Sequence, residues 1–242
     1  MRKSLLILIF PLSIILFTSC RQVSVRGHGK EGTDLRNLTQ FTSIEIDAPV
    51  DATIDIQAGA QNSIELSGYQ NLINYIKTEI KGGVLHIYTT DDIYFSTNTN
   101  VQAHVITNSL NSISISGASD AIVHGNATGS EFNVEVSGAA KVVLDTVNVQ
   151  KFSSDVSGVA KIDIKAGKAQ TAEYEVSGDG NINAFNLQCD DVTADISGTG
   201  KVEVNAQQKL TTEISGAGAV RYKGHPSLNS QTSGAGSVSD AN

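Results

Sequence analysis

Seven Ser-Gly pairs recur at nearly even intervals from residue 116 onward. Their serines are 21, 20, 20, 20, 18 and 18 residues apart, at Ser116, Ser137, Ser157, Ser177, Ser197, Ser215 and Ser233. A fixed period of about twenty residues indicates one supersecondary unit stacked on copies of itself. We therefore expect a repeat architecture in which each unit contacts mainly its neighbours.

Apolar and polar residues alternate along the chain around each Ser-Gly pair. In one copy the apolar positions are Val134, Val136, Gly138, Ala140 and Val142. An alternation of period two predicts β-strands, whereas a helix would need a period near 3.6. The alternation continues through the pair, where the inward side chain shrinks to Gly and then to Gly or Ala. We therefore predict coils made of a strand, a tight bend and a second strand, with glycine supplying unusual dihedral angles and close backbone approach.

This coil predicts the fold class, an all-β parallel β-helix built as a single-stranded solenoid with about 18–21 residues per coil. Aromatic residues make up only 5% of the sequence, so the interior should be narrow and filled by Val, Ile, Leu and Ala. Residues 111–242 give the regular Ser-Gly coils, and residues 41–110 read as degenerate early coils. Together they predict one domain of about ten coils over residues 41–242. In its early part we expect a short helix at 70–76 and a hairpin turn at Gly82-Gly83.

The first twenty residues have the pattern of an export signal. A positively charged start precedes an apolar run over residues 5–17, which is too short for a membrane-spanning helix. The run ends in Cys20 after small residues and resembles a bacterial lipoprotein signal, which implies that residues 1–19 are removed and that Cys20 is lipidated. A plain secretory signal cut at another bond is the alternative. We expect residues 20–40 to be a flexible tether, and the protein to lie in the envelope of a Gram-negative bacterium, anchored by lipid to its outer membrane.

The chain also resembles a known family over residues 40–240. It carries an N-terminal F-x-x-I-x-I, a central I-K-T-E-I-K-G-G-V-L-H-I and a serial V-S-G-x-G/A-x-I. These motifs are similar to those of the autotransporter-adhesin head GIN domain family. The resemblance implies a right-handed parallel β-helix on a secreted or surface-anchored bacterial protein, and an adhesin-like role.

Equivalent positions of stacked coils form columns along the axis. The position two before each serine carries five carboxylates that the alternation places outside, namely Glu135, Asp155, Glu175, Asp195 and Glu213. Neighbouring charges about 4.8 Å apart repel by about 1 kcal/mol even in water, so such a column calls for compensation. One hypothesis is a metal site, with Ca²⁺ favoured, and the other is a solvated face that deters aggregation. A partly basic column, four residues after each serine, could neutralise the acids if the bend brings the two together.

Other reactive side chains do not form a catalytic pattern in the sequence. No His recurs with the repeat, so the serines lack a base, and we expect hydroxyl ladders that bond along the stack. The five His show no metal-ligand spacing, and no cofactor besides Ca²⁺ is expected. Cys189 lies in an apolar alternation and reads as a small buried hydrophobic residue. The adjacent acids Asp91-Asp92 and Asp190-Asp191 are the best local pairs for glycoside hydrolysis.

One stretch, residues 88–100, breaks the alternation. It groups aromatic and acidic residues with Asn, Ser and Thr, and its candidate ligand-binding residues are Tyr88, Asp91, Asp92, Tyr94 and Phe95. Aromatic side chains among small polar residues are typical of a binding patch. The alternative is an ordinary strand in which Ile93 and Phe95 are buried.

The net charge of −8 argues against a nucleic-acid partner, which would require a basic patch. We predict a non-enzymatic, adhesin-like binding module that is anchored to the membrane by lipid and binds a glycan or a surface protein. A carbohydrate-active enzyme of the β-helix type is the first alternative. A structural envelope protein is the second.

Overall fold

The computed structural model describes residues 23–90, 93–96 and 101–242, with 71% in β-strands and 2% in a helix. The helix among them is α1 (Gln70–Ile73). The strands of the N-terminal part are β1 (Val23–Val25), β2 (Glu31–Asn37), β3 (Ser43–Asp47), β4 (Val50–Ile56), β5 (Ser63–Tyr69), β6 (Ile76–Lys81), β7 (Val84–Thr89), β8 (Ile93–Phe95) and β9 (Val101–Thr107). The later strands are β10 (Ser112–Ile115), β11 (Ala121–Val136), β12 (Ala139–Val156), β13 (Val159–Ile164), β14 (Gly167–Val176), β15 (Asp179–Ile196), β16 (Lys201–Ile214), β17 (Ala219–Lys223), β18 (Ser227–Thr232) and β19 (Ser237–Asp240).

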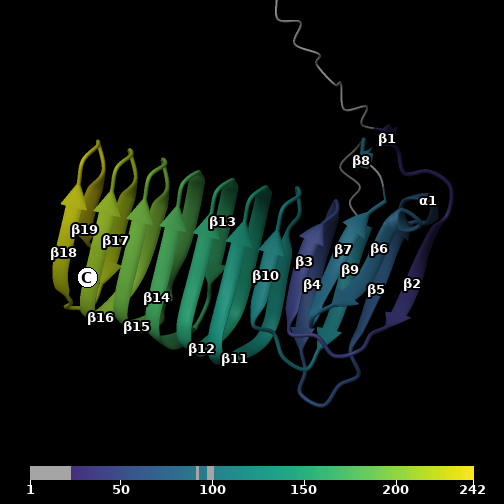
Figure 1. The fold of residues 1–242 in the computed structure, drawn as a ribbon, viewed down its shortest axis with the longest axis horizontal. Helices are drawn as coiled ribbons and strands as arrows, with labels where there is room; N and C mark the ends of the chain where they lie inside the picture. Colours follow the sequence, from purple (N-terminus) through teal and green to yellow (C-terminus); the bar gives the residue numbers. More distant parts are fainter. Residues whose placement is uncertain (1–22, 91–92, 97–100) are drawn as a thin grey trace, which may run out of the picture.

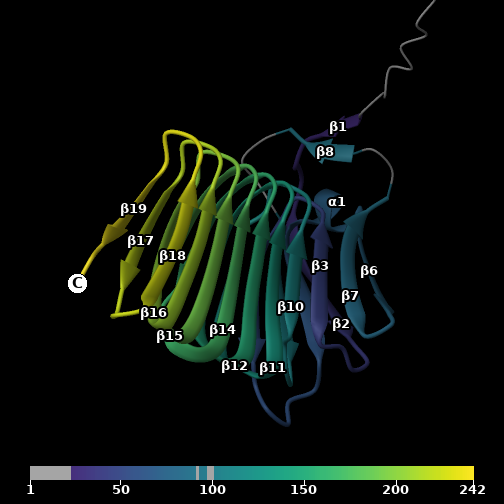
Figure 2. The same ribbon diagram turned by 60° about the vertical axis from the view of Figure 1, so that its left-hand side comes forward.

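The strands from β10 to β19 stack as a parallel β-solenoid (Figure 1). Each coil runs along one side of the solenoid, turns at Ser-Gly and returns along the other side (Figure 2). Glu135, Asp155 and Glu175 are register partners in successive coils, as the twenty-residue spacing predicts. The parallel solenoid is therefore confirmed. It has about six turns, fewer than the ten expected, because the early residues fold differently.

The coils near the C-terminal end have eighteen residues instead of twenty, and a local irregularity in strand pairing accommodates the missing two. The register of β15 against β16 shifts at two places between Asn183 and Asp191. Beyond these shifts the strands are in step again, with Asp195 opposite Glu213. The outward columns therefore continue without interruption from the twenty-residue coils into the eighteen-residue coils.

The inward columns form one continuous apolar core, made mainly of Val, Ile, Leu and Ala side chains. The core contains a short column of three aromatic rings. The ring centroids of Phe132 and Phe152 are 6.5 Å apart, and those of Phe152 and Tyr174 are 5.8 Å apart. Burial raises the pKa of the Tyr174 phenol well above its ordinary value. The narrow aliphatic interior expected from the composition is thus present, with one aromatic column inserted into it.

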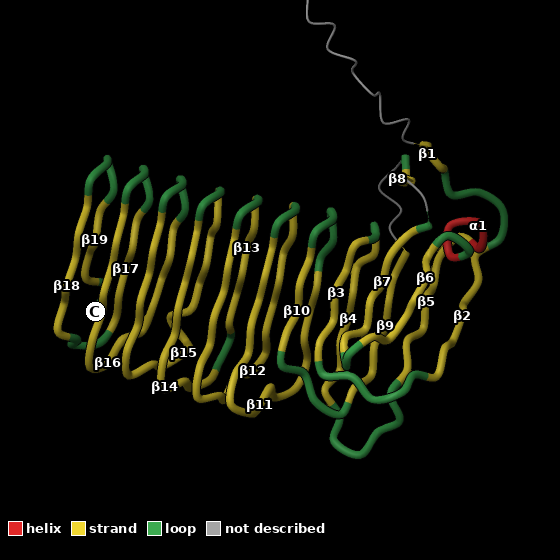
Figure 3. The backbone as a smooth tube through the Cα atoms, viewed as in Figure 1, coloured by secondary structure: helices red, strands yellow, loops and turns green. Residues whose placement is uncertain are grey.

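The Ser-Gly turns lie in line along one edge of the coils, where Figure 3 draws them as loops. A Cβ atom built on Gly178 would lie 2.0 Å from the carbonyl oxygen of Gly158, and one built on Gly158 would lie 2.0 Å from that of Gly138. No side chain can occupy that space, because the obstacle is the backbone of the preceding coil. These glycines do not have positive φ angles. Close approach alone therefore explains them, and the expected unusual dihedral angles are not needed.

The N-terminal part differs from the degenerate coils predicted for residues 41–110. β3 and β4 pair in parallel with β10 and β11, but β7 and β9 pair in parallel with the opposite edges of β3 and β4. β7 and β9 thus lie on the outer side of β3 and β4, although they come later in the chain. The order of the strands in the sheet therefore differs from their order in the sequence. Antiparallel pairs β2–β5, β5–β9 and β6–β7 then close this end. The short helix and the hairpin at Gly82-Gly83 are confirmed by α1 and the β6–β7 pair.

The segment expected to be a flexible tether is structured over much of its length. β2 pairs with β5 from Glu31 to Asn37, and β1 pairs with β8. The polar, glycine-bearing composition concealed these strands because β2 is an edge strand, exposed on one face. Cys20 and the rest of the signal lie outside the described residues. Within the described ranges, no helix has the length and apolar character needed to cross a bilayer.

Candidate functional site

The predicted column of carboxylates is present and faces outward. Parallel pairing places five acids in successive coils at one register position, and all five side chains are exposed. Ser114 and Gln231 occupy the same position in the strands that flank them. We call this set the acid ladder, and its members are Glu135, Asp155, Glu175, Asp195 and Glu213.

A shallow groove runs beside the acid ladder at the Ser-Gly edge. A cavity of about 470 Å³ is lined by carboxylates and serines of four coils, from Asp155 to Ser215. A second cavity of about 160 Å³ continues it toward Ser114 and shares Asp155 and Ser157 with the first. We call the two together the acid–serine groove. One wall is the acid ladder, and the other is the serine column of Ser137, Ser157, Ser177, Ser197 and Ser215.

The serine hydroxyls of the groove do not bond to one another. Among the serines of the Ser-Gly turns in the described part of the chain, only Ser116 makes a side-chain hydrogen bond. It donates to Asp47 at 2.9 Å. The predicted hydroxyl ladder along the stack is therefore wrong. Equivalent groups of stacked coils are about 4.8 Å apart, beyond the length of a hydroxyl hydrogen bond, and the coils are joined here by backbone bonds such as Ser177 N–H to the Val156 carbonyl at 2.9 Å. The hydroxyls remain available to donate to, or accept from, a ligand.

The basic column does not neutralise the acid ladder. Lys141, Lys161 and Lys201 lie on the returning strands, beyond the turn, on the other side of the solenoid. Lys161 pairs with Asp163 at 3.5 Å and Lys201 with Glu203 at 2.6 Å, so these lysines compensate other carboxylates. The bend separates the two columns instead of joining them. Within the described ranges, no ion pair involves a member of the acid ladder.

The environment of Asp195 reflects this lack of compensation. Partial burial raises the pKa of its carboxyl above the ordinary value of 3.8, and the neighbouring charges of Glu213 and Glu173 raise it further. Lys151 pairs with Glu173 at 2.7 Å, two residues along the strand from the ladder member Glu175. In the described residues, no three His, Cys, Asp or Glu side chains converge closely enough to hold a metal ion. A Ca²⁺ site on the ladder therefore stays a prediction, and the geometry adds nothing in its favour.

The ladder column extends into the N-terminal part in a way that sequence spacing does not predict. Glu45 of β3 is the register partner of Ser114, and His86 of β7 is the partner of Glu45. The His86 Nδ1 and a Glu45 carboxylate oxygen are 2.9 Å apart. The inverted strand order brings these residues together, and only the pairing of non-sequential strands reveals it. No repeat motif marks either residue.

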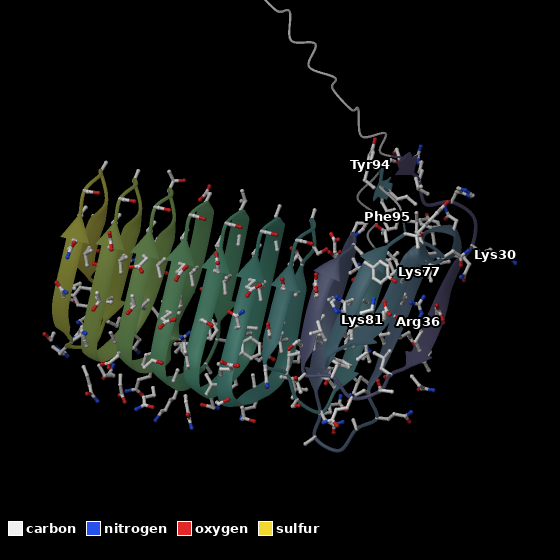
Figure 4. The ribbon with its side chains drawn as sticks, viewed as in Figure 1. Lys30, Arg36, Lys77, Lys81, Tyr94 and Phe95 are labelled. Carbon is white, nitrogen blue, oxygen red and sulfur yellow. The ribbon has the colours of Figure 1, made fainter. Side chains whose placement is uncertain are left out.

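The predicted patch at residues 88–100 is divided by the structure. Tyr88 lies near the end of β7, opposite Asp47, whereas Tyr94 and Phe95 belong to β8 above the N-terminal end (Figure 4). Tyr94 is 49% exposed, but Phe95 is half-buried and packs against the core. Asp91 and Asp92 lie outside the described residues. The binding patch therefore stays a prediction, although Phe95 fits the alternative of an ordinary strand better.

Cys189 is buried, as predicted, and its environment does not suit a nucleophile. Burial raises the pKa of its thiol to about 12, so the thiolate is scarce at neutral pH. Asp190 and Asp191 are exposed. Asp191 is the register partner of Thr171 in the preceding coil and of Lys209 in the next coil, away from the groove. Neither feature adds a reactive group to the site.

Stacked parallel coils with a polar groove along them define the class of the protein as a solenoid repeat protein. Within that class the chain belongs to the family described as "Putative auto-transporter adhesin, head GIN domain", whose model matches residues 40–226. The family resemblance drawn from the motifs is thus confirmed. No curated protein matches the chain.

Solved structures with the same fold come from Bacteroides and Parabacteroides species. A putative adhesin from Bacteroides fragilis is 21% identical with a TM-score of 0.77, and the match covers 90% of this chain and 100% of that one. A putative adhesin from Parabacteroides distasonis is 24% identical with a TM-score of 0.72, over 90% and 100% of the two chains. A "putative lipid binding protein" from the same species is 22% identical with a TM-score of 0.65, over 91% and 100%. At these identities the likeness establishes the fold.

Proposed function

We propose that the protein is a non-enzymatic binding module of the bacterial cell envelope, tethered by a lipid on Cys20 to the outer membrane. The family and its neighbours, named as adhesins, support a surface or envelope role. The export signal of the sequence supports the same location. The ligand of such a module is a glycan or a protein of another surface.

The acid–serine groove is the proposed binding site. The observation that carries this proposal is that its carboxylates and hydroxyls have no ion-pair or hydroxyl partners along several successive coils, within the described residues. Two ladder acids have a polar neighbour: Glu135 accepts from Asn133 Nδ2 at 2.7 Å, and Glu175 is attracted by the charge of Lys151. Free acceptors repeated at about 4.8 Å suit an extended polymer, which can engage equivalent groups coil after coil. The negative wall favours ligands that carry amino groups over sulfated or carboxylated ones.

Binding to an array tests this proposal directly. The chain from residue 21 onward, without lipid, is applied to neutral, amino-bearing and acidic glycans and to immobilised basic peptides. We expect retention on amino-bearing ligands, and binding at least about tenfold weaker for the variant D155N/E175Q/D195N, because charged hydrogen-bond acceptors are lost. The matched control E131Q/D190N/D191N removes the same charge from exposed acids outside the groove and should bind as the parent does. Equal losses in both variants would assign the effect to net charge and reject the groove.

A carbohydrate-active enzyme is the second candidate, and one observation favours it. Asp195 has a raised pKa and has Glu175 and Glu213 as register partners on its two sides. Retaining glycosidases use two carboxyl groups about 5 Å apart, and the one that acts as general acid has a raised pKa. Release of shortened products from an amino-bearing polysaccharide, abolished by D195N, would favour this candidate over simple binding.

A further inference from the structure

We propose that the N-terminal end of the solenoid is a membrane-contacting surface that rests on anionic phospholipid headgroups. The solenoid then stands end-on, and the acid–serine groove extends away from the bilayer. This inference rests on the proposed envelope location, but on no property of the groove.

The charge of the chain is divided between this end and the rest of the solenoid. Residues 23–37 and 70–81, which form β1, β2, α1 and β6, together with their paired strands β5, β7 and β8, carry five Lys or Arg and four Asp or Glu, a net of 5 − 4 = +1. The rest of residues 23–242 carries nine Lys or Arg and 21 Asp or Glu, a net of 9 − 21 = −12. An anionic surface therefore attracts one end of the long axis and repels the remainder.

The basic residues lie on the two edge strands of this end and on the loop before them (Figure 4). Lys77 and Lys81 belong to β6, whose other edge has no strand partner in the described residues, and Lys30 directly precedes β2. Lys30 has no carboxylate partner among the described residues, whereas Lys81 pairs with Glu79 at 2.8 Å and stays 68% exposed. These three ammonium groups can reach phosphate oxygens without unfolding any part of the chain.

Arg36 has a different role at the same end. Its guanidinium pairs with Asp34 at 2.6 Å and reaches across to β6, where it donates to the Ile76 carbonyl at 3.1 Å and to Thr78 Oγ1 at 3.0 Å. It thus joins the edge strands of the two sides and covers the end of the core. We count Arg36 as a structural bridge and leave it out of the lipid-binding set.

Apolar and aromatic side chains are also exposed on the strands of this end. Leu35 of β2 is 62% exposed, and Tyr94 of β8 is 49% exposed. Tyrosine, with an apolar ring and a polar tip, is enriched at the level of lipid headgroups. A basic end with exposed Tyr and Leu therefore has the composition of a membrane-interface surface.

The position of the proposed anchor fits this orientation. Cys20 is three residues from Val23, where β1 begins beside β8. Three residues span at most about 10 Å, so a lipid on Cys20 would hold β1 and β8 near the bilayer surface. Tethering at that distance raises the local concentration, so that a modest net charge is enough to orient the solenoid.

Vesicle binding by the lipid-free chain from residue 21 onward tests the surface. We expect co-sedimentation with phosphatidylglycerol–phosphatidylcholine vesicles at low salt, at least about tenfold weaker binding to pure phosphatidylcholine, and loss of binding at high salt. The variant K30Q/K77Q/K81Q should lose about tenfold or more in affinity for the anionic vesicles. The control K141Q/K168Q/K209Q removes three exposed lysines of the coils and should retain it. Equal binding to the two vesicle types, or equal losses in the two variants, would overturn the proposal.

A second measurement needs no variant. Lysine labelling by an amine-reactive reagent, with mass spectrometry, should show Lys30, Lys77 and Lys81 protected by anionic vesicles, while Lys209 and Lys223 stay reactive. Protection spread evenly along the solenoid would mean that the chain lies flat and would reject the end-on orientation. The glycan array contains no membrane, so failure of the groove proposal and failure of this one are separate results.

Discussion

Replacing Gly178 by Ala tests whether contact between coils dictates the glycine of the Ser-Gly turn. The new Cβ would lie 2.0 Å from the Gly158 carbonyl oxygen, and real Cβ atoms essentially never approach a heavy atom within 3.0 Å. The two coils must therefore separate by at least about 1 Å at this edge. The obstacle is backbone on both sides, so no rotation of a side chain can relieve it.

The cost follows from the hydrogen bonds at that edge. Ser177 N–H and Gly178 N–H donate to the Val156 carbonyl at 2.9 and 3.3 Å, and Asp179 N–H donates to Gly158 at 3.0 Å. A separation of about 1 Å takes all three beyond hydrogen-bond length, at a net cost of about 1 kcal/mol each. The G178A variant should thus lose about 3 kcal/mol of unfolding free energy. For a chain of this size that corresponds to a melting midpoint lower by roughly 6–12 °C.

A matched control comes from the first Ser-Gly pair. A Cβ on Gly117 would meet its nearest atom, the Ala48 backbone, at 3.7 Å, an ordinary contact. We therefore expect G117A to change the midpoint little, within about 0.5 kcal/mol. Thermal unfolding followed by far-ultraviolet circular dichroism measures both variants. If G178A and G117A have the same melting midpoint, the close-approach explanation of the repeat is refuted. The two glycines differ chiefly in how near the backbone of the neighbouring coil lies.

Two further predictions concern polar groups. Ser154 is 2% exposed, and its hydroxyl has no hydrogen-bond partner in the described part of the chain. The S154A variant should therefore have an unfolding free energy about 1 kcal/mol higher, measured by urea titration. A lower stability of this variant would point to a buried partner such as water. Asp145 and Asp195 should respond in opposite directions to neutralisation. The pKa of Asp145 is lowered by hydrogen bonds from His124 and Lys165, so its stabilisation is present at neutral pH and lost as pH falls below its ordinary value of 3.8. The pKa of Asp195 is raised by burial, so its charge opposes folding at neutral pH, and this penalty disappears on acidification. At pH 7 we expect D145N to lower the melting midpoint and D195N to raise it; shifts of the same sign would contradict this assignment.

The repeat coils could be predicted from the sequence because two periods agree there. The period of two fixes which side chains point outward, and the period of twenty fixes which of them lie above one another. Glu175 is two residues before Ser177 in its coil, as Asp155 is before Ser157, and parallel pairing alone converts that identity into a column. The acid ladder thus follows from local pattern and regular stacking, without knowledge of any long-range contact.

The N-terminal end could not be predicted in the same way because its contacts depend on pairing between distant, dissimilar strands. β7 lies between β6 and β3, and no motif in residues 84–89 indicates this position. The bridge from Arg36 to Ile76 and the pair of His86 with Glu45 both depend on that arrangement. The predicted hydroxyl ladder is wrong for another reason, because spacing predicts which serines are adjacent but not whether their hydroxyls come within hydrogen-bond length.

The acid ladder is not a requirement of the fold, and this separates it from the glycine column beside it. Ser114 and Gln231 occupy the same register position as the acids, so a neutral side chain fits this site of the coil. Each pair of neighbouring carboxylates opposes folding by about 1 kcal/mol. Glycine at the turn, by contrast, is enforced by the backbone of the preceding coil. A column that costs stability, and that the fold would accept in neutral form, is not required by the architecture, and both the proposed ligand and a solvated face that deters aggregation would account for it. Substitutions in the ladder should therefore change binding while leaving the solenoid intact.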